Sequence, residues 1–247
     1  MKIAIIGCGV VGQNMKKIFP EALMIDCKEG FPHVTPEWVD LAFVCVPTPM
    51  LPDGSCDTSI VETAIRENRA GVFCVKSTVP PGTIDSLCIT TGESICFSPE
   101  FFGGTQHANA VDYDFVILGG NRHAADIVAE AYKEKMPGSF RIIKTDSKTA
   151  ELCKYMENSF LATKVSFFSE FFRLAEKLEI DVDVLREALL NDPRIGRSHT
   201  FTYREHPWWD SHCLRKDVPA IVRFAESVGV GMPLLQAVLD VNEKHKE

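Results

Sequence analysis

The sequence predicts an α/β protein: a doubly wound parallel sheet at the N-terminus, followed by an all-helical dimerisation domain. Up to residue 146, short apolar runs alternate with helical stretches, which is typical of strands and crossover helices in a mostly parallel sheet. Beyond that point the pattern is helical only. We therefore expect a sheet domain over residues 1–146 and a helical domain over residues 147–247.

The first predicted strand ends in a glycine turn. The apolar run 2–6 leads into Gly7, Gly9 and Gly12, and a helical stretch follows. Gly7 permits a tight turn, Gly9 lets the backbone approach a pyrophosphate, and Gly12 lets the helix pack closely on the strand. Unpaired N–H groups at the helix N-terminus would bind the anionic pyrophosphate. This spacing is the dinucleotide-binding fingerprint of Rossmann domains.

An acidic residue stands where that fingerprint requires one. The apolar run 22–25 ends in Asp26, 19 residues after Gly7, close to the roughly 20 expected for the acid that binds an adenosine ribose. Its carboxylate would accept hydrogen bonds from the 2′-OH and repel a 2′-phosphate, which favours NAD over NADP. The alternative is a glycine turn in a protein that binds no nucleotide, with Asp26 a surface turn residue.

Composition narrows the class of protein. Of 247 residues, 45% are hydrophobic and 24% charged, as in soluble globular proteins, and no apolar stretch approaches the length of a membrane span. The chain starts directly with a core strand, so we expect no leader peptide and a cytoplasmic location. A net charge of −8 argues against a nucleic-acid partner. Nine cysteines without a CxxC pair indicate neither disulfides nor a metal site.

Polar loops follow the next predicted strands. Further strands are expected at residues 41–46, 71–75, 93–97, 115–118 and 140–143, with helices such as 59–68 and 123–135 between them. Proline-rich loops follow three of these strands, at residues 47–49, 76–83 and 98–102. Active residues of such sheets lie at the carboxyl ends of strands, so these loops are expected to line the crevice. The alternative is that proline and glycine merely mark turns.

A long helix is predicted from residue 149 to about residue 178, with an N-cap at Asp146-Ser147. Glu151, Lys154 and Asn158 fall on one face of it. Lys154 and Asn158 could hold a sugar hydroxyl or a water, and the alternative is a solvated polar stripe. Phenylalanines supply apolar surface elsewhere on the helix, from which we expect a homodimer.

The last third is predicted as helices 182–191, 218–228 and 233–244, with an irregular segment at residues 192–217. That segment holds Trp208, Trp209 and Cys213, and a loop of this length is usually functional or an interface. Lys216 follows Cys213 by three residues, and a nearby cation can lower a thiol pKa towards the reactive thiolate. Considered alone, the cysteine is better explained as an inert thiol than as a reactive one.

Seven ordered motifs resemble the UDP-glucose/GDP-mannose dehydrogenase family. They lie at residues 7–12, 44–49, 76–83, 98–101, 149–158, 192–196 and 213–217. The resemblance implies oxidation of the C6 hydroxymethyl group of a nucleotide sugar to a carboxylate in two NAD-dependent steps, through a thioester on a cysteine.

The matching positions imply roles for individual residues. Cys213 would be the nucleophile, with Lys154 and Asn158 as groups that hold an oxyanion or water. Thr78 and Glu100 would bind or activate the hydrolytic water, with Lys216 and Asp217 beside the cysteine. Arg194 would reach the substrate from the neighbouring subunit. The catalytic residues are then Cys213, Lys154, Asn158, Asp217, Thr78 and Glu100; the cofactor contacts are Gly7, Gly9, Val10, Val11, Gly12, Asp26, Pro47, Thr48 and Thr78; the substrate contacts are Glu100, Lys154, Asn158, Arg194 and Lys216.

The chain departs from the family in two places. Family members continue past the position of Asn242 into a further domain that binds the nucleotide, so we expect a short form that lacks this UDP-binding domain and relies on a separate chain or a smaller substrate. Trp208 and Trp209 stand where the family has a glycine-rich stretch, and are expected to crowd the sugar pocket. Two alternatives stay open: a β-hydroxyacid dehydrogenase-like enzyme using Lys154 and Asn158, and a non-catalytic NAD-binding or scaffold protein.

Overall fold

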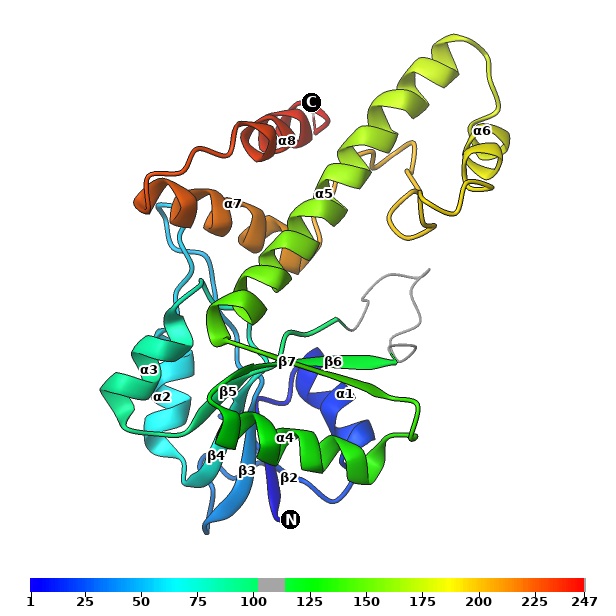
Figure 1. Cartoon of the computed structure of the whole chain (residues 1–247). Helices are drawn as coiled ribbons and strands as arrows, with labels where there is room; N and C mark the ends of the chain where they lie inside the picture. Colours follow the sequence, from blue (N-terminus) through cyan, green and yellow to red (C-terminus); the bar gives the residue numbers. More distant parts are fainter. Residues whose placement is uncertain (102–113, 247) are drawn as a thin grey trace. The chain divides into compact units, whose positions relative to one another are not determined.

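A computed structural model describes residues 1–101 and 114–246 of the chain (Figure 1). The chain divides into two compact units. The first, called here the sheet unit, comprises Met1–Leu51 and Cys56–Lys154, and the second, the helical unit, comprises Pro52–Ser55 and Tyr155–Glu247. The division falls inside one long helix, so the expected boundary at residue 146 stays a prediction. None of the helices in the described ranges is long and apolar enough to cross a membrane.

The sheet unit is built on a seven-stranded, mostly parallel sheet. Its strands are β1 (Ile3–Ile6), β2 (Leu23–Ile25), β3 (Val39–Val44), β4 (Ala70–Val75), β5 (Ile95–Phe97), β6 (Phe115–Gly120) and β7 (Arg141–Thr145). The spatial order is β2-β1-β3-β4-β5-β6-β7. Strands β1 to β5 run parallel, β6 is antiparallel to β5, and β7 is parallel to β6. The predicted doubly wound α/β fold is confirmed.

Helices cover both faces of this sheet (Figure 1): α1 (Val10–Ile18), α2 (Ser59–Glu67), α3 (Thr83–Thr91) and α4 (Arg122–Lys135). Successive strand residues point to opposite faces, so each strand supplies two cores. Ala4 and Ile6 pack with residues of α2 and α3, whereas Ile5, between them, packs with α1 and α4. The near-continuous apolar runs of the central strands follow from this double burial.

The helical unit contains most of α5 (Ser147–Lys177), together with α6 (Val182–Leu189), α7 (His212–Ser227) and α8 (Pro233–Lys244). Its buried cluster consists of Ala162, Trp209, Leu214, Val218 and Val238. The indole N–H of Trp209 donates to Ser166 Oγ at 3.0 Å, and its backbone is bonded in both directions to the Asn242 amide. Trp209 therefore belongs to the core of this unit.

The predicted start of α7 was wrong by six residues. The sequence analysis placed it at Val218, directly before Pro219. In the structure α7 begins at His212 and carries Pro219 in its interior. Ser211 is the N-cap, and its hydroxyl accepts the N–H of Leu214 at 3.4 Å. Cys213 is thus a residue of the first helical turn and not part of the irregular segment.

Candidate functional site

The glycine turn joins β1 to α1. Gly7 has φ +99°, and a Cβ there would lie 2.5 Å from the carbonyl oxygen of Cys45. A Cβ at Gly12 would lie 1.9 Å from the carbonyl oxygen of Gly7. Gly9 has no atom within 4 Å of its Cβ position, so the space beside it is open. Both packing glycines are therefore required, and the third leaves room for a ligand, as the spacing predicted.

Asp26 lies at the end of β2, beside this turn. Its Oδ2 accepts the Cys8 N–H at 2.5 Å and its Oδ1 accepts the Lys28 N–H at 3.0 Å. Partial burial acts to raise the pKa of Asp26, but the two backbone N–H groups outweigh it and hold the pKa below its usual range. A carboxylate has further lone pairs, so Asp26 can still accept a hydrogen bond from a hydroxyl group.

The other predicted cofactor contacts lie at the carboxyl edge of the sheet. Strand β1 lies between β2 and β3, so the chain leaves β1 on one side and returns to β3 on the other. The carboxyl ends of β1 and β3 therefore form a topological switch point, where ligands bind in such sheets. Pro47 and Thr48 follow β3, and Thr78 follows β4. Ser77 ties these loops together, since its hydroxyl donates to the Val46 carbonyl at 2.6 Å. Val10 and Val11 open α1, whose first turn contains no acidic residue.

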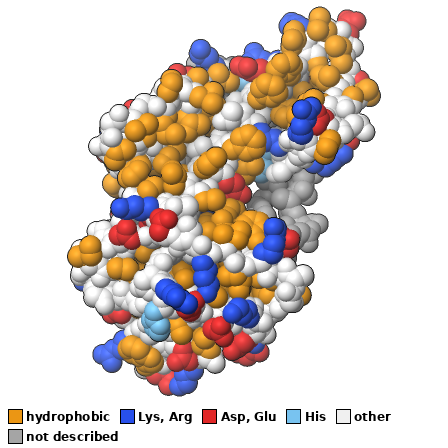
Figure 2. Space-filling view, viewed as in Figure 1, with side chains coloured by type: hydrophobic (Ala, Val, Ile, Leu, Met, Phe, Trp, Pro, Cys, Tyr) orange, Lys and Arg blue, Asp and Glu red, His pale blue; other side chains and the backbone are white. Residues whose placement is uncertain are grey.

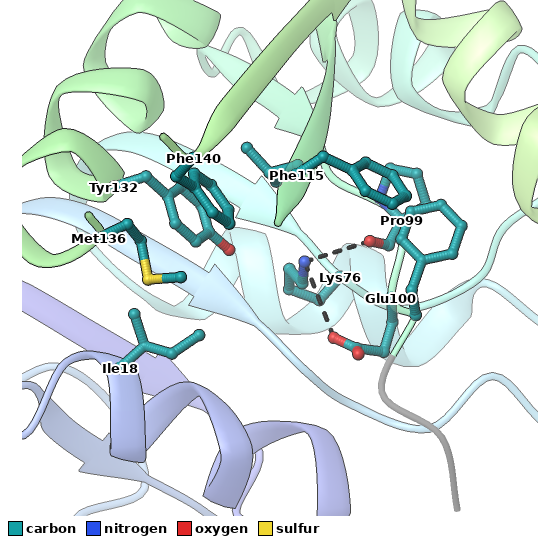
Figure 3. A pocket seen from close by; sticks show the side chains of 10 residues that line it. Ile18, Lys76, Pro99, Glu100, Phe115, Tyr132, Met136 and Phe140 are labelled. Atoms are coloured by element: carbon teal, nitrogen blue, oxygen red, sulfur yellow. Dashed lines mark hydrogen bonds and ion pairs between the residues drawn. The ribbon is translucent and has the colours of Figure 1, made fainter. Parts of the chain in front are cut away.

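A buried lysine, which the sequence reasoning missed, lies next to Glu100 (Figure 3). Lys76 Nζ is 3.1 Å from Ser98 Oγ, 3.3 Å from the Pro99 carbonyl oxygen and 3.8 Å from Glu100 Oε2. These groups border a cavity of about 40 Å³, which has room for water but not for a sugar or a cofactor. A charged residue directly after the apolar strand 71–75 was the signal that could have identified it.

The polar stripe on α5 is buried, so the alternative of a solvated stripe was wrong. Glu151, Lys154 and Asn158 are 0%, 8% and 4% exposed. Glu151 accepts the N–H groups of Gly82, at 2.6 Å, and Ile84, at 2.8 Å, at the start of α3. Burial raises the pKa of Glu151 to about 7, against the opposing effect of these two hydrogen bonds. Lys154 Nζ lies 5.1 Å from the centre of the Phe101 ring.

In the helical unit, a polar network surrounds the turn that carries Cys213. Asp217 follows Cys213 by four residues on α7 and is 1% exposed. Its Oδ1 lies 2.6 Å from Lys216 Nζ, and its Oδ2 accepts the amide of Asn158 at 2.7 Å. The Cys213 residue itself is exposed. Cys213 lies in the first turn of α7, three residues before Lys216 on the same helix.

Arg194 lies in the segment between α6 and α7, and its side chain is 84% exposed. Within its own chain it binds Asp192, with Nε 2.9 Å from Oδ1 and 3.0 Å from Oδ2. The structure therefore places Arg194 on the surface of the helical unit.

Residues 148–244 match the central domain of the UDP-glucose/GDP-mannose dehydrogenase family, and residues 32–136 match the family's NAD binding domain. The chain belongs to this family. The match identifies the cofactor as NAD, and the open space at Gly9, the helix N-terminus at Val10 and the carboxylate of Asp26 fit it.

The chain spans about half the length of the curated relatives it matches. UDP-glucose 6-dehydrogenase TuaD of Bacillus subtilis is 29% identical over 221 residues, which cover 84% of this chain and 47% of that protein. The UDP-glucose 6-dehydrogenase of Pseudomonas aeruginosa is 31% identical over 229 residues, with 84% and 49% covered. The structure of a UDP-glucose dehydrogenase from Pyrobaculum islandicum superimposes with a TM-score of 0.79 at 28% identity, and covers 98% of this chain and 68% of that chain.

Proposed function

We propose that this family member oxidises the C6 hydroxymethyl group of a nucleotide sugar of the UDP-glucose type to a carboxylate, with Cys213 as the nucleophile. The arrangement around Cys213 is the observation that carries the proposal. The thiol lies on the first turn of α7, and the buried Asp217 one turn later binds both Lys216 and Asn158. A buried carboxylate that orders a lysine and an asparagine beside a cysteine fits covalent catalysis better than a structural thiol.

When bound, NAD accepts one hydride in each of the two oxidations. Between them, the Cys213 thiolate forms a bond to the aldehyde carbon, and the carbonyl oxygen takes up the negative charge. Asn158 uses one amide N–H for Asp217, and we assign its second N–H, with the ammonium of Lys154, to that oxygen. In the last step water adds to the thioester carbon, its proton passes to Glu100, and the carbon–sulfur bond breaks to return the thiolate. Thr78 is assigned to hold that water.

The remaining substrate contacts are assigned to Lys216 and to Arg194, the latter acting across a homodimer. An exposed apolar face on α5 supports the dimer, and Figure 2 shows hydrophobic side chains gathered over the end of this helix. Its members are Leu152, Met156, Phe160, Phe167, Phe171 and Leu174. A contiguous face of this kind commonly marks an interface between subunits.

The nucleotide of the substrate is proposed to be held outside these 247 residues. The relatives are about twice as long as this chain, and the residues described above account for NAD and for the reacting carbon but supply no clamp for a uridine diphosphate. The clamp would come from further polypeptide, on the same chain or on a separate one.

The proposal is tested by acid formation from millimolar UDP-glucose and NAD. We expect Cys213→Ser to form no acid, while Cys88→Ala, which removes a thiol from α3, keeps the wild-type rate. Undiminished acid formation by Cys213→Ser would contradict the proposal. One NADH per turnover, with Cys213→Ser unimpaired, would favour a hydroxyacid dehydrogenase that uses Lys154 and Asn158. NAD binding without oxidation of any sugar by either protein would favour a non-catalytic role.

A further inference from the structure

We propose that Lys76 is a positioning residue for Glu100, which it keeps ionised and fixed at the carboxyl edge of the sheet. The inference deepens the proposed function and rests on it, since Glu100 is the group to which that function assigns the proton of the hydrolytic water. Lys76 itself is assigned no contact with substrate.

The contacts of Lys76 are made to three consecutive residues. Its ammonium binds Ser98 Oγ, the Pro99 carbonyl oxygen and the Glu100 carboxylate, at 3.1, 3.3 and 3.8 Å. Figure 3 shows the lysine side chain pointing at this stretch from the end of β4. The ammonium donates hydrogen bonds to Ser98 and Pro99 and pairs with Glu100 by charge, so one lysine contacts all three residues of this turn. The loop is thereby fixed by a side chain of the neighbouring strand.

Charge explains why this lysine is tolerated inside the protein. Lys76 is 4% exposed, and an uncompensated buried ammonium is costly. Among the residues that the structure describes, the titratable groups that act on it are the Cys45 and Cys74 thiols, the Tyr132 phenol and the Glu100 carboxyl, and of these Glu100 is the carboxylate. Burial lowers the pKa of Lys76, but Tyr132 and Glu100 outweigh it and raise the pKa above its usual range.

The surroundings make the pairing strong. The cavity beside the pair is lined mainly by apolar and aromatic side chains, of which Tyr132 is buried and the others are half-buried: Ile18, Phe101, Phe115, Tyr132, Met136 and Phe140. In such a place the loss of a cation favours the protonated form of a carboxyl group, because burial penalises the charged form. A protonated Glu100 cannot accept a proton from water. Lys76 thus keeps Glu100 available as the base that receives the proton when water attacks the thioester carbon and the sulfur leaves as thiolate.

Carbon-13 NMR of labelled glutamate carboxyl groups tests the pairing without any turnover. The Glu100 signal is assigned as the one that disappears in Glu100→Gln, and its titration midpoint is then compared among variants. Loss of a cation at this distance raises a carboxyl pKa by about one to three pH units. We expect that rise in Lys76→Met, a midpoint near the wild-type value in Lys76→Arg, and no change in Lys133→Met, which removes an exposed lysine of α4. Equal midpoints in the wild type and in Lys76→Met would overturn the proposal.

The reverse substitution keeps the test decisive if Lys76→Met does not fold. Coupling between two sites is reciprocal, so Glu100→Gln must lower the Lys76 pKa, followed by its labelled ε-carbon, by a comparable amount. An unchanged Lys76 titration overturns the proposal. The acid-forming step separates this inference from the proposed function: if acid is formed, Lys76→Met shifts the pH profile of that step upward with the Glu100 midpoint, and an unshifted profile refutes the positioning role. A chain that forms no acid but shows both titration shifts would sink the proposed function and leave the pairing intact.

Discussion

Replacement of Glu151 by glutamine is expected to change how the stability of the protein depends on pH. The carboxylate is fully buried, and both of its oxygens accept backbone N–H groups at the start of α3. Burial raises the pKa of Glu151 from 4.5 to about 7, so the folded protein keeps this proton to a higher pH than the unfolded chain does. The associated stability is fully present below about pH 4.5 and is lost as the pH rises through 7.

The magnitude follows from the size of this change. Each pKa unit corresponds to about 1.4 kcal/mol, so the wild type should lose about 3 kcal/mol of unfolding free energy between pH 4.5 and pH 7.5 through this group alone. Glutamine cannot ionise, so the Glu151→Gln variant lacks that loss. It gives up one backbone hydrogen bond at every pH, because its amide NH₂ cannot accept, at a cost of about 1 kcal/mol.

Urea unfolding at half-unit steps from pH 4.5 to pH 8 measures the effect. We expect the unfolding free energy of the variant, relative to that of the wild type, to rise by about 3 kcal/mol across this pH range. Glu170→Gln is the matched control, since it removes the same charge from an exposed position on the same helix and should follow the wild type. Two parallel curves for Glu151→Gln and wild type would refute the reasoning.

Three further predictions concern binding, assembly and turnover. Calorimetry should show that NAD binds much more tightly than NADP, because Asp26 repels a 2′-phosphate; equal affinities would remove the role given to Asp26. Sedimentation should give a dimer at micromolar concentration and a monomer for Phe171→Glu, which places a charge on the exposed apolar face of α5; a monomeric wild type would contradict the dimer. With millimolar UDP-glucose, turnover should stay far below the roughly 1–10 per second of an ordinary enzyme, because each missing charged phosphate contact forfeits about 1.5–3 kcal/mol; ordinary turnover would show that contacts outside this chain are dispensable.

The sheet unit was largely predictable because its sequence signals are local. Two glycines of the turn lie where a Cβ atom does not fit. A Cβ at Gly7 or at Gly12 would overlap a backbone carbonyl oxygen. The position of Asp26 at the end of β2 was predictable for a similar reason, because it follows Gly7, at the end of β1, by the number of residues typical of this motif. Short apolar runs predicted the strands, because strand side chains are buried on both faces of the sheet.

The proposed catalytic groups were harder to place because their contacts join residues far apart in the sequence. The bond between Asn158 and Asp217 joins residues 59 positions apart, and no local pattern encodes it. The family resemblance identified both residues as site residues, but it did not predict the hydrogen bond between them. Cys213 was predicted to lie in an irregular segment, whereas the helix begins at His212, behind the Ser211 cap, and continues through Pro219. Lys76 was missed because a lysine in a loop usually lies on the surface.

The ratio of NADH formed to acid formed tests the central claim most directly. Cys213 as the nucleophile of a four-electron oxidation requires two NADH for each carboxylate, however slow the reaction. We expect a ratio of two in the wild type and no acid in Cys213→Ser. One NADH for each product molecule, with Cys213→Ser unimpaired, would contradict the account.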